Sequence, residues 1–185
     1  MKYTLGFLAG LTLVSSAYLP LAYSQFVGGG AGGVVSPEGS YAYLQYGQSF
    51  DADFDYDYQY HVFLEAAHAG ISDLESGTES FDLEQMMLSL NGSISTNFSE
   101  GFWGELGAGA GLARVELSGP DTTADDTDFV FMGQLFANVG VSITDYLDCY
   151  TGVKYYYVGE TDYQEELALE STDDFIIQAG IRVAF

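Results

Sequence analysis

The 185-residue sequence is poor in cysteine and in positive charge, and each shortage excludes a class of protein. Its single cysteine, Cys149, has no partner in the chain, so a domain built on internal disulfides is excluded. Four Lys and Arg residues stand against 27 Asp and Glu residues, which gives a net charge of −23. A basic surface for nucleic acid is therefore absent, and no nucleic-acid partner is expected.

Long hydrophobic segments are also missing once the N-terminal region is passed. No later segment approaches the roughly 18 consecutive apolar residues that a transmembrane helix needs, which excludes helical spanning. Yet 48% of the residues are hydrophobic and 16% are aromatic, which an acidic disordered chain would lack. If such a protein crosses a membrane, it must close a β-sheet on itself, because lipid offers no partner for open backbone groups.

The N-terminal region has the pattern of an export signal. A lysine at position 2 is followed by a short apolar run and then by small residues, and the run is too short to span a bilayer as a helix. Ala22 and Ser24 fit a small-x-small cleavage site, and a cut after Ala17 is the alternative. We therefore expect a signal peptide over residues 1–24 and one β-barrel domain over residues 25–185.

Alternation with a period of two residues is the main structural signal in the rest of the chain, and residues 129–143 show it most clearly. One face of this segment carries Phe129, Phe131, Leu135, Ala137, Val139, Val141 and Ile143. The other face is mixed, with Gln134, Asn138 and Ser142 beside apolar residues. One apolar and one mixed face suit a strand between lipid and a barrel lumen.

Six further segments alternate in the same way, and the total of seven predicted strands is odd. They are residues 40–49, 54–68, 81–95, 101–117, 147–158 and 175–185. A closed up-and-down antiparallel barrel with both ends on one side needs an even number. The favoured missing strand is the Gly-rich segment 25–35, and the alternative is a bent segment 51–68 that contributes to two strands.

The connections between these strands also follow the pattern of outer-membrane barrels. Short connections are predicted over 96–100 and 144–146, and longer polar ones over 72–80, 118–127 and 159–172. The predicted fold class is all-β: a transmembrane antiparallel up-and-down β-barrel of eight strands, in the outer membrane of a Gram-negative-type bacterium. A soluble lipocalin-like barrel would need its polar face outside, which the continuous apolar face disfavours.

The C-terminus adds a resemblance to known proteins. The last eight residues resemble the assembly signal of outer-membrane barrels, in which Gln178, Gly180, Val183 and Phe185 take the spaced positions. Segments 104–115 and 131–157 are also similar to the membrane domain of the eight-stranded OmpA-type, or opacity-type, barrel family. This resemblance implies the fold better than the function, because the family is functionally diverse. We expect the barrel-assembly machinery, outer-membrane lipid and lipopolysaccharide as partners, and a monomer.

Charged residues on the mixed faces form the candidate site. The alternation places Glu65, Glu105, Lys154 and Arg182 in the lumen, which in an eight-stranded barrel is only wide enough for side chains. An isolated buried charge is very costly, so we predict the pairs Glu105–Arg182 and Glu65–Lys154. A polar core that holds the barrel together is the favoured interpretation, and a gate that opens when the pairs exchange is the alternative. Arg114 is expected on the outer face, against lipopolysaccharide phosphate or water.

No catalytic residue, metal site or cofactor is predicted, and the acidic loop residues are interpreted as a solvated face because none has EF-hand spacing. The expected function is structural or surface-interacting, in envelope integrity or adhesion. A narrow conduit for small or hydrophobic solutes is the alternative. A lipid A-modifying enzyme is a remote alternative. Such an enzyme needs a His close to a Ser and an acid. His68, Ser72 and Asp73 are its candidates, but His68 and Ser72 are about 13 Å apart along one strand.

Overall fold

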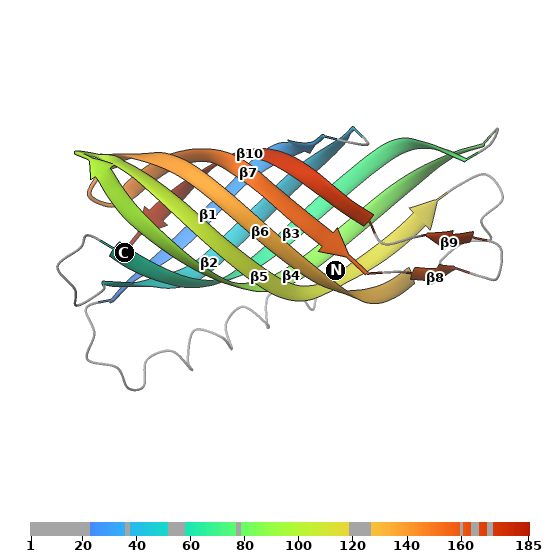
Figure 1. Ribbon diagram of the computed structural model, residues 1–185, viewed down its shortest axis with the longest axis horizontal. Coiled ribbons are helices and arrows are strands. Elements are labelled where there is room, and N and C mark those ends of the chain that lie inside the picture. The colour runs from blue at the N-terminus through green and yellow to red at the C-terminus, as the bar shows by residue number, and fades with distance from the viewer. Residues whose placement is uncertain are drawn as a thin grey trace, which may run out of the picture.

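The computed structural model describes residues 23–35, 38–51, 58–76, 79–118, 127–159, 161–163, 167–169 and 172–185. Eight long strands within them close into a barrel, and two short ones form a separate sheet (Figure 1). The barrel strands are β1 (Tyr23–Val34), β2 (Gly39–Asp51), β3 (Tyr58–Ser76), β4 (Glu79–Ser99), β5 (Phe102–Ser118), β6 (Thr127–Thr144), β7 (Leu147–Val158) and β10 (Thr172–Ala184). The short sheet pairs β8 (Thr161–Tyr163) with β9 (Leu167–Leu169).

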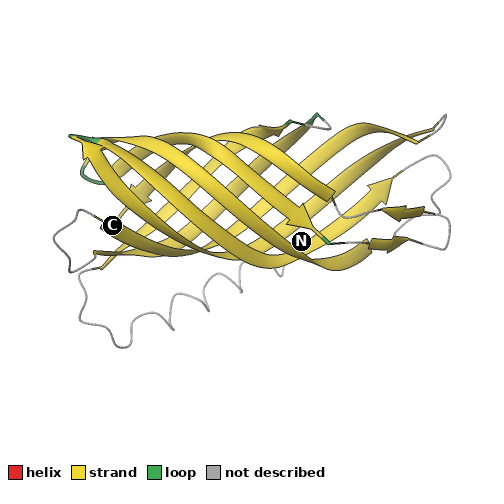
Figure 2. Cartoon of the chain, viewed as in Figure 1, coloured by secondary structure: helices red, strands yellow, loops and turns green. Residues whose placement is uncertain are grey.

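Every neighbouring pair of barrel strands is antiparallel, in the order β1-β10-β7-β6-β5-β4-β3-β2. Pairing of β1 with β10, from Phe26 opposite Ala184 to Val34 opposite Ile176, closes the barrel. The predicted eight-stranded antiparallel barrel is confirmed. Figure 2 shows strands joined by loops, and no helix in the described part of the chain is long and apolar enough to cross a membrane.

The Gly-rich segment is the first strand, as favoured from the sequence, and the alternative of one bent segment supplying two strands is wrong. Segment 51–68 is instead divided, because β2 ends at Asp51 and β3 begins at Tyr58. The glycines allow close packing inside the barrel. A Cβ atom at Gly30 would collide with the Ala179 carbonyl oxygen and the Tyr43 hydroxyl, so only glycine admits the tyrosine here.

Several predicted strand boundaries were wrong. The predicted loop 72–80 is mostly strand, since β3 continues to Ser76 and β4 begins at Glu79, with a register shift between Ile71 and Leu74. Polar residues misled the prediction because an antiparallel ribbon can have water on its faces. The predicted loop 159–172 contains the β8–β9 hairpin. Residues 1–22, most of the predicted signal peptide, and residues 54–57 of a predicted strand lie outside the described residues.

The turn after β4 is also tighter than the sequence indicated. β4 runs to Ser99, and residues Glu100 and Gly101 make the connection to β5. Gly101 has a φ of 75°, a left-handed conformation that glycine adopts without steric cost. We call this end of the barrel, which also carries the Asp145–Tyr146 turn, the turn end, and the opposite end the loop end.

The outer wall is apolar, as the alternation predicts. Leu106, Leu135 and Ile177 are 64%, 58% and 60% exposed, although each lies in the middle of a paired strand. Their sequence neighbours on the other face, Glu105 and Phe136 among them, are buried. A continuous exposed apolar surface of this kind is a liability in water and suits contact with lipid.

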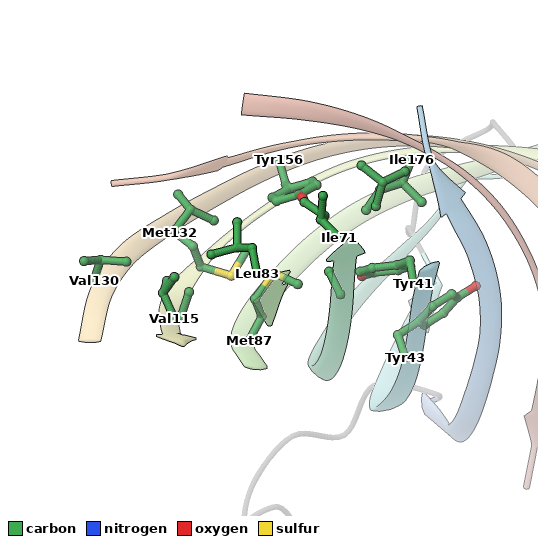
Figure 3. Packing of buried hydrophobic residues seen from close by; sticks show 14 of the residues in the cluster. Tyr41, Tyr43, Ile71, Leu83, Met87, Val115, Val130, Met132, Tyr156 and Ile176 are labelled. Carbon is green, nitrogen blue, oxygen red and sulfur yellow. The ribbon is translucent and has the colours of Figure 1, made fainter. Parts of the chain in front are cut away.

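The interior contains two different regions. Near the turn end and at mid-height, polar and charged side chains are buried beside aromatic rings such as Phe26, Phe63 and Trp103. Beyond Lys154, toward the loop end, they are mainly hydrophobic, and we call this group the apolar cap (Figure 3). The apolar cap consists of Ile71, Leu83, Val115, Val130, Met132, Tyr156, Val158 and Ile176.

Candidate functional site

Two charged groups lie in the lumen, and Glu65 is the centre of the upper one, which is nearer the loop end. Its Oε1 atom lies 2.5 Å from Lys154 Nζ, and the two side chains are only 2% and 1% exposed. The Tyr41 hydroxyl donates a hydrogen bond of 3.0 Å to Glu65. Gln45 and Gln134 donate further bonds of 3.0 and 3.1 Å. The carboxylate therefore has four donors, which compensates for its removal from water.

Lys154 is held by aromatic rings as well as by its carboxylate partner. Its Nζ atom donates to the Tyr41 hydroxyl at 2.9 Å and lies 5.1 Å from the ring centroids of Tyr41 and Tyr43. The Phe136 ring is 5.9 Å away on another strand. A buried ammonium gains from such π faces when water is excluded, so this group ties β2, β3, β6 and β7 together.

Arg182 and Glu105 form the lower charged group, nearer the turn end. Arg182 Nη2 lies 3.2 and 3.1 Å from the two Glu105 carboxylate oxygens. Ser93 and Asn138 donate hydrogen bonds to the same carboxylate at 2.6 and 3.0 Å. The guanidinium carbon also lies 4.7 Å from the centroid of the Phe26 ring. The second pair therefore resembles the first in having a fully bonded carboxylate and an aromatic-backed cation.

Neutral side chains occupy the space beside the two charged groups. Gln134 donates both to Glu65 and to Asn91 Oδ1, the latter at 2.5 Å. Across the lumen the Tyr43 hydroxyl donates to the Tyr150 hydroxyl at 2.9 Å. Tyr150 is within 3.5 Å of Gln45, which itself bonds Glu65. The Glu65–Lys154 pair is therefore part of a larger hydrogen-bonded network, and the Arg182 guanidinium carbon lies 5.6 Å from the centroid of the Tyr150 ring at its edge.

The lumen is open at the turn end and filled at the loop end. A polar cavity of about 810 Å³ at the turn end reaches His61 and Arg182. His61 is held between Ser49 at 2.7 Å and Ser95 at 2.8 Å. At the other end the side chains of the apolar cap pack together, and the Gln85 amide and the Tyr156 hydroxyl have no hydrogen-bond partner among the described residues. Side chains therefore fill the cross-section above Glu65, as the width of an eight-stranded barrel requires.

The structure brings the four sequence-predicted lumen residues together as the pairs Glu65–Lys154 and Glu105–Arg182. Sequence reasoning missed the supporting hydrogen-bond donors, of which Gln134 and Asn138 were already on the predicted inner face. It also missed the apolar cap. Arg114 lies on the outer wall and pairs with Glu116 at 3.1 Å.

The four C-terminal residues that resemble an assembly signal lie on both faces of β10 and just after it. Gln178 is buried and donates to Asn138 at 3.0 Å, and Gly180 lies against the Tyr43 and Tyr150 side chains. Val183 belongs to the outer face, and Phe185 is 69% exposed.

Residues considered for metal binding and for catalysis lie apart from this network. Among the described residues no group of three or more His, Cys, Asp or Glu side chains is placed to hold a metal ion. His68 lies on the outer wall beside Glu84, with 3.9 Å between Nε2 and Oε2. The side chains of Ser72 and Asp73, its proposed partners, lie outside the described part.

Comparison with solved structures places this geometry among known folds. No protein-family model matches the sequence, and no curated protein matches it. A major outer membrane protein from Thermus thermophilus superposes with a TM-score of 0.58 at 12% identity, covering 89% of this chain and 100% of that chain. The chain has the fold of a small outer-membrane β-barrel.

Two further structures support the assignment of this outer-membrane barrel fold. The N-terminal β-barrel domain of Pseudomonas aeruginosa OprF has a TM-score of 0.51 at 11% identity, covering 88% of this chain and 97% of that one. Neisserial surface protein A has a TM-score of 0.50 at 18% identity, covering 88% and 96%. Identities this low establish a common fold and leave the role of the barrel to its own residues.

Proposed function

We propose that this protein is a structural or surface-interacting barrel of the outer membrane, in which the lumen is closed. Its interior stabilises the barrel. Its outer wall and loop end contact the envelope or an external surface, and these contacts serve envelope integrity or adhesion. Lipid and lipopolysaccharide surround the wall, and the assembly machinery engages the β10 strand. We expect it to act as a monomer and to need no catalysis in the lumen.

The filling of the lumen is the single observation that carries this proposal. Two ion pairs, each nearly fully buried, lie across the interior, and the apolar cap lies above them. Opening a path would require separating Glu65 from Lys154, which leaves two buried charges without partners. Removing one partner of such a pair costs about 3–5 kcal/mol, so spontaneous opening is rare. A conduit for solutes is therefore disfavoured.

Planar-bilayer recording of the refolded barrel tests the closed lumen. We expect no unitary current steps from the wild type. A Met132→Ala/Ile176→Ala variant serves as the comparison, because it truncates two side chains of the apolar cap. If the cap closes the lumen, this variant should show current more often than the wild type. Regular single-channel steps from the wild type would contradict the closed lumen and favour the conduit.

Expression in a Gram-negative host tests the surface role. Cells carrying the barrel are compared with cells carrying a variant in which residues 119–126 are replaced by Gly and Ser, for adhesion and for resistance to detergent. Heat-modifiable migration on gels verifies that both proteins are folded. We expect the replacement to remove the gain in adhesion or resistance. Equal gains from both proteins would exclude residues 119–126 as the source of the effect, and no gain from either would contradict the surface role.

A further inference from the structure

Three side chains of the types found in serine esterase sites lie on the outer wall near the loop end. Gly70 on β3 is directly opposite Ser40 on β2 and Glu84 on β4. His68 precedes Gly70 by two residues, so it shares their face and is the diagonal neighbour of both Ser40 and Glu84. Ser40, His68 and Glu84 are all exposed. The sheet register therefore brings a hydroxyl, an imidazole and a carboxylate from three strands to one patch.

The missing side chain of Gly70 leaves the space between these groups open. A Cβ atom at this position would meet only two atoms within 4 Å, Ser40 Oγ at 3.5 Å and His68 Cε1 at 3.8 Å. On its other side the imidazole has Nε2 3.9 Å from Glu84 Oε2. His68 thus lies on the strand between Ser40 and Glu84, so the register places the three side chains in the order nucleophile, base and orienting acid.

An apolar groove on the same wall ends at His68. Its volume is about 840 Å³, and its lining includes no acidic or basic side chain other than His68. The groove lining includes Gly29, Ala42, Leu44, Ala66, Met86 and Ile181. Small residues at three of these positions leave a depression in an otherwise crowded wall. Its apolar lining suits an acyl chain.

The patch also lies where the ester bonds of a membrane lipid are found. Met86, one row below Glu84 on β4, is 54% exposed and belongs to the apolar wall, whereas Glu84 is charged. This change from apolar to charged residues marks the boundary between hydrocarbon and headgroups. Ester linkages join acyl chains to headgroups at that boundary. The chain has a net charge of −23, which favours a zwitterionic lipid over a multiply phosphorylated one.

We propose that Ser40, His68 and Glu84 form an esterase site that hydrolyses an acyl ester of a zwitterionic glycerophospholipid whose chain lies in the groove. Ser40 Oγ attacks the ester carbonyl carbon while His68 accepts the hydroxyl proton, with Glu84 orienting the imidazole. The bond from the carbonyl carbon to the lipid oxygen breaks, and His68 returns the proton to that oxygen. Water then attacks the carbonyl carbon of the acyl-serine and gives a proton to His68. The bond from that carbon to Ser40 Oγ breaks, His68 returns the proton to Oγ, and the fatty acid is released.

Covalent labelling of the refolded barrel in detergent tests the nucleophile. A fluorophosphonate probe is added and the modified residue is identified by mass spectrometry. We expect one label on Ser40, its loss in Ser40→Ala, and a labelling rate about 10²–10⁴-fold lower in His68→Ala. Ser142→Ala, which removes an exposed serine at the turn end, is the matched control and should label as the wild type does. Heat-modifiable migration verifies folding of every variant.

Release of fatty acid from vesicles tests the substrate. Phosphatidylcholine with ester-linked chains should release fatty acid, and the ether-linked analogue should release none. Ala66→Leu, which fills the groove, should slow release from long-chain lipid more than release from a short-chain ester. Release from lipid A vesicles alone would overturn the assigned lipid. Absence of Ser40 labelling, with release no faster than in Ser40→Ala, would overturn the site and leave the proposal of a closed lumen untouched.

Discussion

Removing the ammonium group of Lys154 tests the buried network most sharply. In Lys154→Met the apolar stem of the side chain is nearly preserved, while the positive charge beside Glu65 is lost. The carboxylate, 2% exposed, then remains in the lumen without a counter-ion. We expect the variant to fold into the same barrel with a lower free energy of unfolding, because a buried charge has lost its partner.

The size of the effect follows from the contacts that remain. Breaking a buried pair costs about 3–5 kcal/mol, but Glu65 keeps hydrogen bonds from Tyr41, Gln45 and Gln134. We therefore expect a loss near the lower end, about 3 kcal/mol. The double variant Lys154→Met/Glu65→Gln removes both charges and should lie within about 1 kcal/mol of the wild type, since an uncharged pair has no such desolvation cost.

Urea unfolding in detergent micelles, followed by the fluorescence of Trp103, measures these differences. Trp103 is the only tryptophan and is buried, so its emission reports loss of the barrel interior. A loss of about 3 kcal/mol lowers the urea midpoint by roughly 1–3 M at an ordinary m-value. Arg114→Met is the matched control. It breaks a partly exposed pair on the outer wall and should cost less than about 1 kcal/mol.

The comparison between single and double variants decides the outcome. If Lys154→Met costs no more than Arg114→Met, the Lys154–Glu65 pair is not a buried pair of charges. If the double variant is as unstable as the single one, the loss comes from packing around Lys154 rather than from the unpaired charge of Glu65.

Substitutions at Gly140 and Tyr156 test the packing of the lumen, with Gly92→Ala as the control. Gly140→Ala should lower the unfolding free energy by about 1–3 kcal/mol, because the new Cβ would collide with the Trp103 indole. Gly92→Ala, where nothing lies within 4 Å, should change it by less than about 0.5 kcal/mol; equal effects in urea titrations would refute this packing. Tyr156→Phe removes a buried hydroxyl that has no hydrogen-bond partner in the described part of the chain, so stability should stay constant or rise by about 1 kcal/mol. A clear loss in the same titration would reveal a partner for that hydroxyl.

Much of the fold is predictable because lipid and lumen impose opposite demands on alternate residues. That contrast identified seven of the barrel strands, β2 to β7 and β10, and an even strand number required the Gly-rich β1. The ion pairs were also predictable, since Glu65 and Glu105 are inward acids at about the same heights as the inward cations Lys154 and Arg182. A buried charge without a partner is too costly to persist, which left few arrangements.

The rest depends on information that alternation does not carry. Inward hydrophobic residues such as Met132 look like irregularities in a mixed face, so the apolar cap was missed until all strands were assembled. The patch of Ser40, His68 and Glu84 depends on the register of three strands. That register is set by two hairpin connections, and one of them was predicted to be much longer than it is. Along the chain His68 is 28 residues from Ser40 and 16 from Glu84, so no local motif joins them.

Quenching by brominated lipid tests most directly whether the apolar face lies against the membrane and the other face in the lumen. Leu135 and Phe136 are consecutive in β6, and they are 58% and 6% exposed. Single tryptophans are introduced at each position in a Trp103→Phe background, and the barrels are refolded into vesicles containing lipids brominated in the acyl chain. We expect strong quenching of Leu135→Trp and little quenching of Phe136→Trp. Equal quenching at both positions, or the reverse order, would contradict the assignment of the two faces.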